Sequence, residues 1–332
     1  MSIGSTTFDE PAAQLRRLLG RGEDGSRPGV PLVGSGLNLQ AARLEGETED
    51  DWSGLLDRIA AEMGVRRSVL DALPDWNLAR WESMLRLWAR KKKIEPLQAE
   101  TELQKLTCNH LRSQEAKASR WQLYSEFAAA GFQDLISLNF DRRIALSRPG
   151  TAFMAAPKPP EGPQGEVMYR HDRIPQGEGG DTRVWYPHGD TKKYSTLKLG
   201  VRRYGFYVAL LAEKYLRLGD DWRFKRGWDY RREDETYFDY GVSWIDAFFG
   251  RDVVFIGCGL SPDEWPLWSM IRRRTAGSHA APDMARPGLF YVRAGPPRPL
   301  DVPAHVLQRH QIQVLAFSSF DDMWTAIRAA IG

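Results

Sequence analysis

The stretch GVPLVGSGLN, residues 29–38, carries the strongest signal for the fold. Its apolar run ends at Gly34, Ser35 and Gly36, which is the pattern of a short buried strand followed by a glycine turn. Glycines at such a turn let the backbone approach a ligand closely, and the first amides of a following helix can bind a phosphate group. The same pattern is common in ordinary tight turns, and the third glycine of a dehydrogenase fingerprint is missing.

The rest of the chain, and its last third above all, alternates between predicted strands and helices, as a doubly wound sheet does. We predict an α/β fold: a Rossmann-like parallel sheet with helices on both faces and a helical insertion module. A single domain of residues 1–332 is expected, in which 25–45 and 131–332 form the Rossmann-like core and 46–130 form the helical insertion. Further predicted strands lie at 134–138, 184–186, 196–199, 253–257, 289–292 and 313–317, and predicted helices include 81–87, 97–111, 121–130, 242–249 and 265–274.

Helix caps and breakers refine this prediction. Asp50 or Asp51 is expected to cap a helix that begins near Trp52, and Ser319 is expected to cap the closing helix. The segment 149–180 is dense in proline and glycine, so we predict a long loop that could act as a lid.

Composition narrows the class of protein. The apolar share of 42% and the charged share of 27% are ordinary for a globular domain. The net charge of +3 is too small by itself to predict a nucleic-acid or membrane partner, so direct nucleic-acid contact is not expected. No apolar run has the length of a membrane span, and the N-terminus lacks the pattern of a signal peptide. We therefore expect a cytoplasmic protein.

The two cysteines cannot build a four-cysteine zinc site, and no metal is expected. Cys258 lies in the apolar run VVFIGCGL, which predicts a buried side chain. Cys108 lies near His110 in a polar helical stretch, where a surface helix is a better interpretation than a two-ligand metal site.

Polar residues follow several predicted strands. Asn139 and Asp141 follow one strand, and His188 follows another. Because ligands of open α/β sheets bind beyond the carboxyl ends of the strands, these residues are candidate site residues. His188 sits between proline and glycine and has a suitable pKa range for a general base. Taken alone, each of these motifs is equally typical of a turn or loop.

Four motifs in order are more specific than each motif alone. The chain contains VGSG (33–36), SLNFD (137–141), PHGD (187–190) and FIGCGLSPDE (255–264). This order resembles the SIR2-like, sirtuin-related domain of bacterial antiphage-defence proteins. The resemblance extends from about Val33 to the closing helix and includes the final AFSSFDDMWTAI.

The resemblance implies that two glycine turns bind NAD. One turn would cradle the phosphates and the other would face the adenosine half. The implied binding residues are Gly34, Ser35, Gly36 and Asn38 in the first turn, and Gly257, Gly259 and Ser261 in the second.

The resemblance also implies a reacting end. Asn139 matches the asparagine that positions the nicotinamide ribose or the attacking water, and Asp141 matches the acid near the carboxamide. His188 matches the histidine that acts on the ribose hydroxyls. Sirtuin deacetylases carry a glutamine where this chain has Leu138, and they carry a zinc module that two cysteines cannot form. The related proteins without that module are commonly NAD hydrolases.

The sequence therefore predicts an NAD⁺ hydrolase that acts in abortive-infection antiphage defence, with NAD as substrate. A homo-oligomer or a separately encoded partner, such as an ATPase, nuclease or sensor, is expected to control it, with residues 50–130 as the interface. Three alternatives stay open: an NAD or ADP-ribose sensor, a structural subunit of a defence complex, and an NAD-dependent deacylase.

Overall fold

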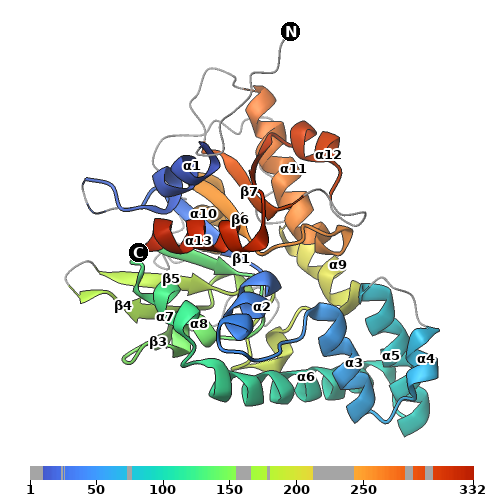
Figure 1. Ribbon diagram of the computed structural model, residues 1–332. Helices are drawn as coiled ribbons and strands as arrows, with labels where there is room; N and C mark the ends of the chain where they lie inside the picture. Colours follow the sequence, from blue (N-terminus) through green and yellow to red (C-terminus); the bar gives the residue numbers. More distant parts are fainter. Residues whose placement is uncertain are drawn as a thin grey trace, which may run out of the picture.

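One eight-stranded sheet forms the centre of the molecule (Figure 1). The computed structural model describes residues 10–23, 25, 27–72, 77–154, 166–177, 180–211, 243–280, 287–295 and 302–332. The strand order is β3-β4-β5-β2-β1-β6-β7-β8, with parallel pairing from β5 to β8 and antiparallel pairing among β3, β4 and β5. The strands are β1 (Gly29–Val33), β2 (Asp134–Ser137), β3 (Ala152–Met154), β4 (His171–Pro175), β5 (Asp181–Trp185), β6 (Asp252–Ile256), β7 (Leu289–Ala294) and β8 (Ile312–Phe317).

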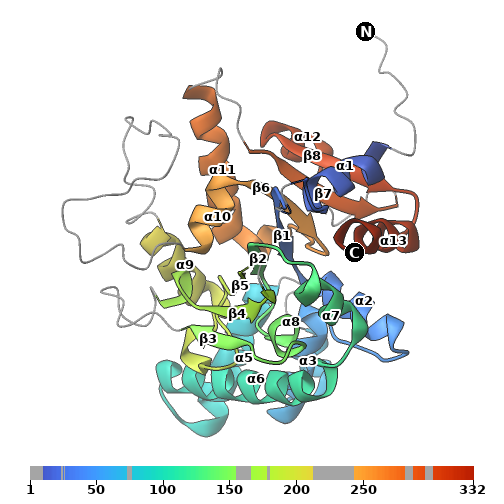
Figure 2. The same cartoon turned by 90° about the vertical axis from the view of Figure 1, so that its left-hand side faces the viewer.

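Helices cover both faces of this sheet (Figure 2). Successive residues of a strand point to opposite faces, so Val254 and Ile256 of β6 join one apolar cluster while Val253 and Phe255 join the other. The first face packs against α1 (Glu10–Leu19), α2 (Ser35–Leu44), α7 (Gln122–Ala129), α8 (Arg143–Leu146) and α13 (Phe320–Ile331). The second packs against α9 (Gly200–Leu211), α10 (Trp244–Gly250), α11 (Trp265–Ala280) and α12 (Ala304–Arg309).

Four further helices lie together below the sheet in both views (Figures 1 and 2). They are α3 (Trp52–Glu62), α4 (Arg67–Asp71), α5 (Asn77–Lys92) and α6 (Pro96–Ala118). Their apolar side chains form a third cluster, which also contains Phe140, Leu197 and Leu199. Because Phe140 follows β2, and Leu197 and Leu199 lie beyond β5, these helices pack against the loops at the carboxyl ends of the strands.

Both predicted caps are confirmed. Asp51 accepts a hydrogen bond from the Gly54 amide at 2.8 Å at the start of α3. Ser319 accepts from the Asp322 amide at 3.0 Å at the start of α13. Cys258 is buried, as predicted. None of the helices among the described residues combines the length and apolar character that a membrane span requires.

Some local predictions are wrong. The segment 149–180 was predicted to be a long loop, but it contains β3 and β4, which extend the sheet by antiparallel pairing. The side chains of Asp172 and Ile174 in β4 are buried, which anchors this extension. Residues 155–165 and 178–179 lie outside the described residues. The predicted strand 196–199 is a 3₁₀ turn (Tyr194–Thr196) and a loop, since the Thr196 hydroxyl bonds to the Lys193 carbonyl oxygen at 2.7 Å. Two short 3₁₀ turns also occur at Glu166–Met168 and Pro262–Glu264, so α11 begins after Pro262.

Candidate functional site

The carboxyl ends of four parallel strands meet at one edge of the sheet. β5, β2, β1 and β6 are neighbours in this order and run in the same direction. Gly34 follows β1, Asn139 follows β2, His188 follows β5 and Gly257 follows β6. The chain winds outward from β1 in both directions, and open α/β sheets bind ligands at such a point.

The two glycine turns pack directly against each other. The Gly36 amide donates to the Gly257 carbonyl oxygen at 2.9 Å, and Gly257 has a left-handed φ of 61°. A Cβ atom on Gly36 would lie 2.6 Å from the Gly257 Cα, and one on Gly34 would lie 2.7 Å from the Gly257 carbonyl oxygen. These three glycines are therefore required for the turns to touch. Gly259 differs, because a Cβ there would meet no described atom within 4 Å.

Most amides of the first turn are already used within the protein. The Gly34 amide donates to the Ile256 carbonyl oxygen at 3.0 Å, and the Leu37 amide donates to the Gly34 carbonyl oxygen at 3.0 Å. The Gly36 amide is used as well. Ser35, at the start of α2, has an amide without an acceptor among the described residues, so it is the donor that this turn can offer to an anion.

Asn139 is held by a buried network of hydrogen bonds. Its Nδ2 donates to the Gly34 carbonyl oxygen at 3.1 Å and to Asn38 Oδ1 at 3.2 Å. Asn38 Oδ1 also accepts from the Tyr124 hydroxyl at 3.0 Å, and Asn38 Nδ2 donates to Asp141 Oδ2 at 2.8 Å. Because both amide protons of Asn139 are used, its carbonyl oxygen is the atom that can accept a hydrogen bond from a ligand.

Arg143 lies fully buried behind this network. Its guanidinium donates to both carboxylate oxygens of Glu49, at 2.8 and 3.1 Å, and its Nε lies 3.7 Å from Asp141 Oδ1. Burial disfavours the charge of Arg143, but the carboxylates of Asp141 and Glu49 outweigh burial and hold its pKa above the usual value. Both oxygens of Asp141 thus have protein donors nearby, and Asp141 supports Asn139 through Asn38.

His188 is buried among aromatic rings and one carboxylate. Its ring centroid lies 6.2 Å from that of Phe140 and 5.5 Å from that of Tyr204. His188 Nε2 is 3.3 Å from Glu264 Oε2, which is close enough for an ion pair although the two groups are not aligned for a hydrogen bond. Burial raises the pKa of the Tyr204 hydroxyl, so this phenol stays neutral beside the histidine.

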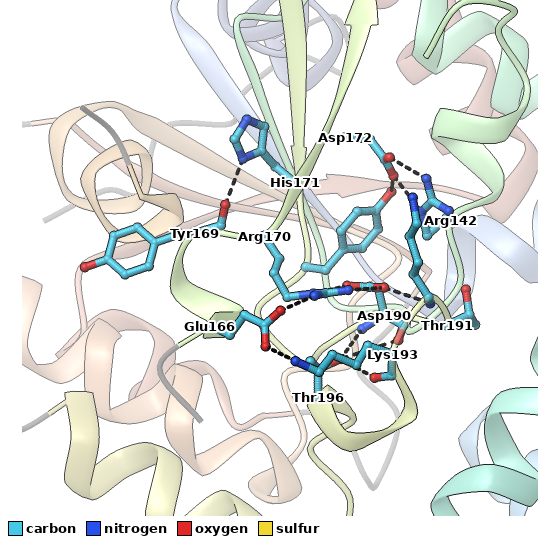
Figure 3. A network of polar contacts seen from close by, with 12 residues as sticks. Arg142, Glu166, Tyr169, Arg170, His171, Asp172, Asp190, Thr191, Lys193 and Thr196 are labelled. Atoms are coloured by element: carbon cyan, nitrogen blue, oxygen red, sulfur yellow. Dashed lines mark hydrogen bonds and ion pairs between the residues drawn. The ribbon is translucent and has the colours of Figure 1, made fainter. Parts of the chain in front are cut away.

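An ionic network fixes the turn that carries His188 (Figure 3). Asp190 is fully buried and accepts two hydrogen bonds from Arg170, at 2.6 and 3.0 Å. Arg170 also pairs with Glu166, and Lys193 lies 2.6 Å from the second oxygen of Glu166. Buried charges with satisfied partners make a rigid support.

Helix α6 holds the same turn from the other side. Cys108 Sγ and Arg112 Nε both donate to the Thr191 carbonyl oxygen, at 2.9 and 2.6 Å. The prediction of a surface position for Cys108 is therefore wrong: its side chain is buried against the turn, and burial raises the pKa of its thiol.

A single cavity of about 270 Å³ collects these features. Nine of the ten candidate residues line it, and the tenth, Gly36, packs against Gly257. Among the lining residues that the sequence analysis did not single out are Glu264, Asp263 and Arg143. The acidic pair in SPDE, directly after the second glycine turn, was the available signal for the first two. The nine candidate residues are Gly34, Ser35, Asn38, Asn139, Asp141, His188, Gly257, Gly259 and Ser261.

Helices α3, α5 and α6, with the loop before α3, supply the opposite wall of the cavity. Trp52 of α3 lies near Phe140, with ring centroids 5.4 Å apart and ring planes tilted by 46°, and His110 of α6 lines the same cavity. Sequence patterns could not reveal this wall because its residues lie far from the glycine turns along the chain. The remaining residues that this region contributes are Glu49, Asp50, Asp51, Ser53, Leu55, Asn77, Leu78, Leu111 and Gln114.

Acidic groups dominate the charge of the cavity. Among the described residues that line it, six carry carboxylates and one, Arg143, carries a guanidinium group. Burial raises the pKa of Asp263 to about 6, with the neighbouring Glu264 adding to the effect. Such a lining favours a cationic group over an anionic one at the centre. No cluster of three or more potential metal ligands occurs among the described residues.

Comparison with known proteins adds no relative. The sequence matches no protein-family model and no curated protein.

Proposed function

We propose that the chain is an NAD⁺ glycohydrolase that cleaves the bond between nicotinamide and ribose. One observation carries the proposal: His188, Asn139 and the two glycine turns, which are far apart in the sequence, line one cavity at the carboxyl edge of the sheet. The acidic lining adds support, because the nicotinamide ring of NAD⁺ and the oxocarbenium-like ribose are both cationic.

The chemistry would need one water molecule. The C–N bond to nicotinamide breaks and its electron pair stays on the nicotinamide nitrogen, while a water oxygen bonds to the ribose carbon and loses a proton. His188 would accept that proton directly or through a second water, and Glu264 would stabilise the resulting imidazolium. The carbonyl oxygen of Asn139 would orient the water or a ribose hydroxyl. The products are nicotinamide, ADP-ribose and a proton.

The rest of the substrate sets further roles. We assign Ser35 to the diphosphate, because its amide is unused and lies at the start of α2. The adenosine half would extend past Gly259 and Ser261, where the surface is open. Asp141 would act through Asn38 as a positioning residue, since protein donors already approach both of its oxygens.

We further propose a Rossmann-like core with residues 46–130 as a helical insertion, of which α3, α5 and α6 close the cavity. Control by self-assembly or by a separate protein, and a role in antiphage defence, rest on the resemblance to SIR2-like proteins. The second candidate is an NAD or ADP-ribose sensor. It is favoured because Asp141 and Arg143 are engaged by protein partners, so these side chains have a structural role in the cavity and need not take part in a reaction.

The decisive experiment incubates the purified chain with NAD⁺ and follows nicotinamide and ADP-ribose by chromatography. We expect turnover by the unaltered chain and at least a 100-fold loss in His188→Ala and Asn139→Ala, because general-base help alone is worth roughly 10²–10⁴ in rate. His110→Ala is the matched control, since His110 lines the same cavity from the opposite wall.

Folding of each variant is checked by circular dichroism. Near-normal nicotinamide release by folded His188→Ala would overturn the assignment of His188. If the unaltered chain binds NAD⁺ without releasing nicotinamide over hours, the sensor replaces the hydrolase. Acyl-lysine peptide added with NAD⁺ tests deacylation in the same assay.

A further inference from the structure

A second cavity, of about 870 Å³, lies at the opposite edge of the sheet from the candidate site. It is formed where the chain enters the parallel strands: Arg27 and Pro28 precede β1, Phe132 and Gln133 precede β2, and Arg251 precedes β6. The hairpin of β4 and β5 completes it. We call this cavity the arginine groove.

Positive charge dominates this groove. Five arginines line it, against one lining carboxylate, that of Asp181; they are Arg21, Arg27, Arg173, Arg183 and Arg251. The buried carboxylate of Asp134 pairs with Arg183 at 2.8 Å and with Arg251 at 3.2 Å. One carboxylate therefore serves two guanidinium groups, and the groove keeps an excess of positive charge.

Three of these arginines are held in place by the protein. Arg27 donates to the carbonyl oxygens of Ala130 at 2.6 Å and Ile331 at 2.8 Å. Arg251 donates to the Arg27 carbonyl oxygen. Burial, together with the nearby charge of Arg21, lowers the pKa of Arg27 to about 10, as expected where cations gather without full neutralisation.

The other two arginines are available to a ligand. Arg21 and Arg173 are exposed, and neither guanidinium group forms a hydrogen bond or ion pair with another described residue. They lie on the loop after α1 and on β4. A fixed floor of guanidinium groups with two free arginines at the rim is suited to several negative charges in a row.

We propose that the arginine groove binds the phosphate backbone of a nucleic-acid strand. Backbone binding requires cations and is independent of apolar pockets. A docked protein would need aromatic or apolar anchors, and a free nucleotide would need an apolar slot for its base. Apart from glycines, Pro28 and the buried Phe132 are the apolar residues in the described part of the lining, so neither alternative fits as well.

This inference differs from the expectation based on net charge. The total of +3 conceals a local concentration of arginines that are distant in the sequence. It is independent of the proposed NAD⁺ cleavage, which uses the opposite edge of the sheet.

The test is fluorescence anisotropy with a labelled 12-nucleotide single strand of mixed sequence, titrated with the full chain at 50 to 200 mM salt. We expect micromolar binding at low salt. The double variant Arg21→Gln/Arg173→Gln should weaken it at least tenfold and reduce the slope of log K against log salt by about 1.4, since each phosphate contact on a single strand contributes about 0.7. The matched control is Arg66→Gln/Arg86→Gln, which removes the same charge from two exposed arginines of the helical region.

Equal weakening by both double variants, or no binding by the unaltered chain, would overturn the proposal. Two competitors identify the source of the negative charge. If inorganic tripolyphosphate displaces the strand at equal phosphate concentration, the ligand of the groove is a small polyphosphate and the assignment to a nucleic-acid strand is overturned. A polyglutamate peptide that competes as strongly as unlabelled strand would overturn the assignment to phosphate.

Discussion

The side chain of Asp263 in the candidate site lowers the free energy of unfolding at neutral pH. Its carboxyl group is buried, and one of its oxygens has no hydrogen-bond partner among the described residues. Burial raises the pKa of Asp263 to about 6 from an ordinary 3.8. Ionising this group therefore requires more free energy in the folded state than in the unfolded chain. Strained electrostatics of this kind cluster at functional sites.

The pH dependence of this cost gives a prediction. Between pH 4 and pH 6 the folded state holds the Asp263 proton longer than the unfolded state, so the free energy of unfolding falls as pH rises through this window. Asp263→Asn removes the effect. Its stability advantage over the unaltered chain should grow by about 1–2 kcal/mol from pH 4.5 to pH 7.5.

Urea denaturation of both proteins at the two pH values measures this difference. Asp322→Asn is the control, because Asp322 is an exposed carboxylate whose hydrogen bonds to Ser318 and Ser319 lower its pKa. Any difference in the free energy of unfolding between Asp322→Asn and the unaltered chain should disappear at acid pH. At pH 7.5 the variant should be no more stable than the unaltered chain. A pH-independent change in Asp263→Asn would contradict the explanation.

At the scale of elements, the contact between the first two glycine turns joins β1 to β6. A Cβ on Gly36 would overlap the Gly257 Cα at 2.6 Å, whereas a Cβ on Gly259 would meet nothing within 4 Å among the described residues. We predict that Gly36→Ala lowers the free energy of unfolding by about 1–3 kcal/mol, as overpacking does. Gly259→Ala should change it by less than about 0.5 kcal/mol.

Thermal and urea denaturation of the two variants check this prediction, with Gly259→Ala as the matched control. Equal stability of the two variants would show that the turns can separate without cost. A selective loss of NAD⁺ binding in stable Gly259→Ala would instead locate substrate at the open turn.

Much of this level could be predicted from the sequence, for physical reasons. Buried parallel strands read as apolar runs that end in glycine or polar residues, so β1, β2, β6 and the residues after them were found correctly. Because the carboxyl ends of parallel strands meet at one edge of a sheet, those residues could also be predicted to lie together there.

The remaining elements depend on contacts that local patterns do not encode. β3 and β4 are short strands in a region rich in proline and glycine, and they form because β4 pairs with β5 and β3 pairs with β4. Glu264 is predictable as an acid near a turn, but its approach to His188 depends on the packing of Tyr204 and α11. The helical wall is recognisable as helices, yet its position over the strand ends follows from the cluster around Phe140.

For the whole molecule, the sheet separates two charge environments. Acidic residues gather at the carboxyl ends of the strands, and arginines gather at the amino ends. The dipoles of the helices do not explain this separation, since the N-terminus of α2 makes the acidic edge more positive. The side chains themselves therefore create the two fields, and each field favours a ligand of opposite sign.

Binding and cleavage at the acidic edge can be separated in the whole protein. A ligand that binds the folded state alone stabilises it by about 2.7 kcal/mol at 100 times its dissociation constant. We predict that ADP-ribose raises the melting temperature of the unaltered chain, and that NAD⁺ does the same for His188→Ala, in which substrate is not consumed. Differential scanning fluorimetry over a range of ligand concentrations measures both shifts.

The pattern of shifts distinguishes the three interpretations of the cavity. A hydrolase shows a shift with ADP-ribose and releases nicotinamide from NAD⁺. A sensor shows both shifts without release, and a structural subunit shows neither. Adenosine, which lacks the diphosphate and the second ribose, should give a smaller shift if Ser35 and Asn139 contact those groups. A shift with adenosine equal to that with ADP-ribose would contradict the orientation proposed for the substrate, because the reacting ribose would then add nothing to binding.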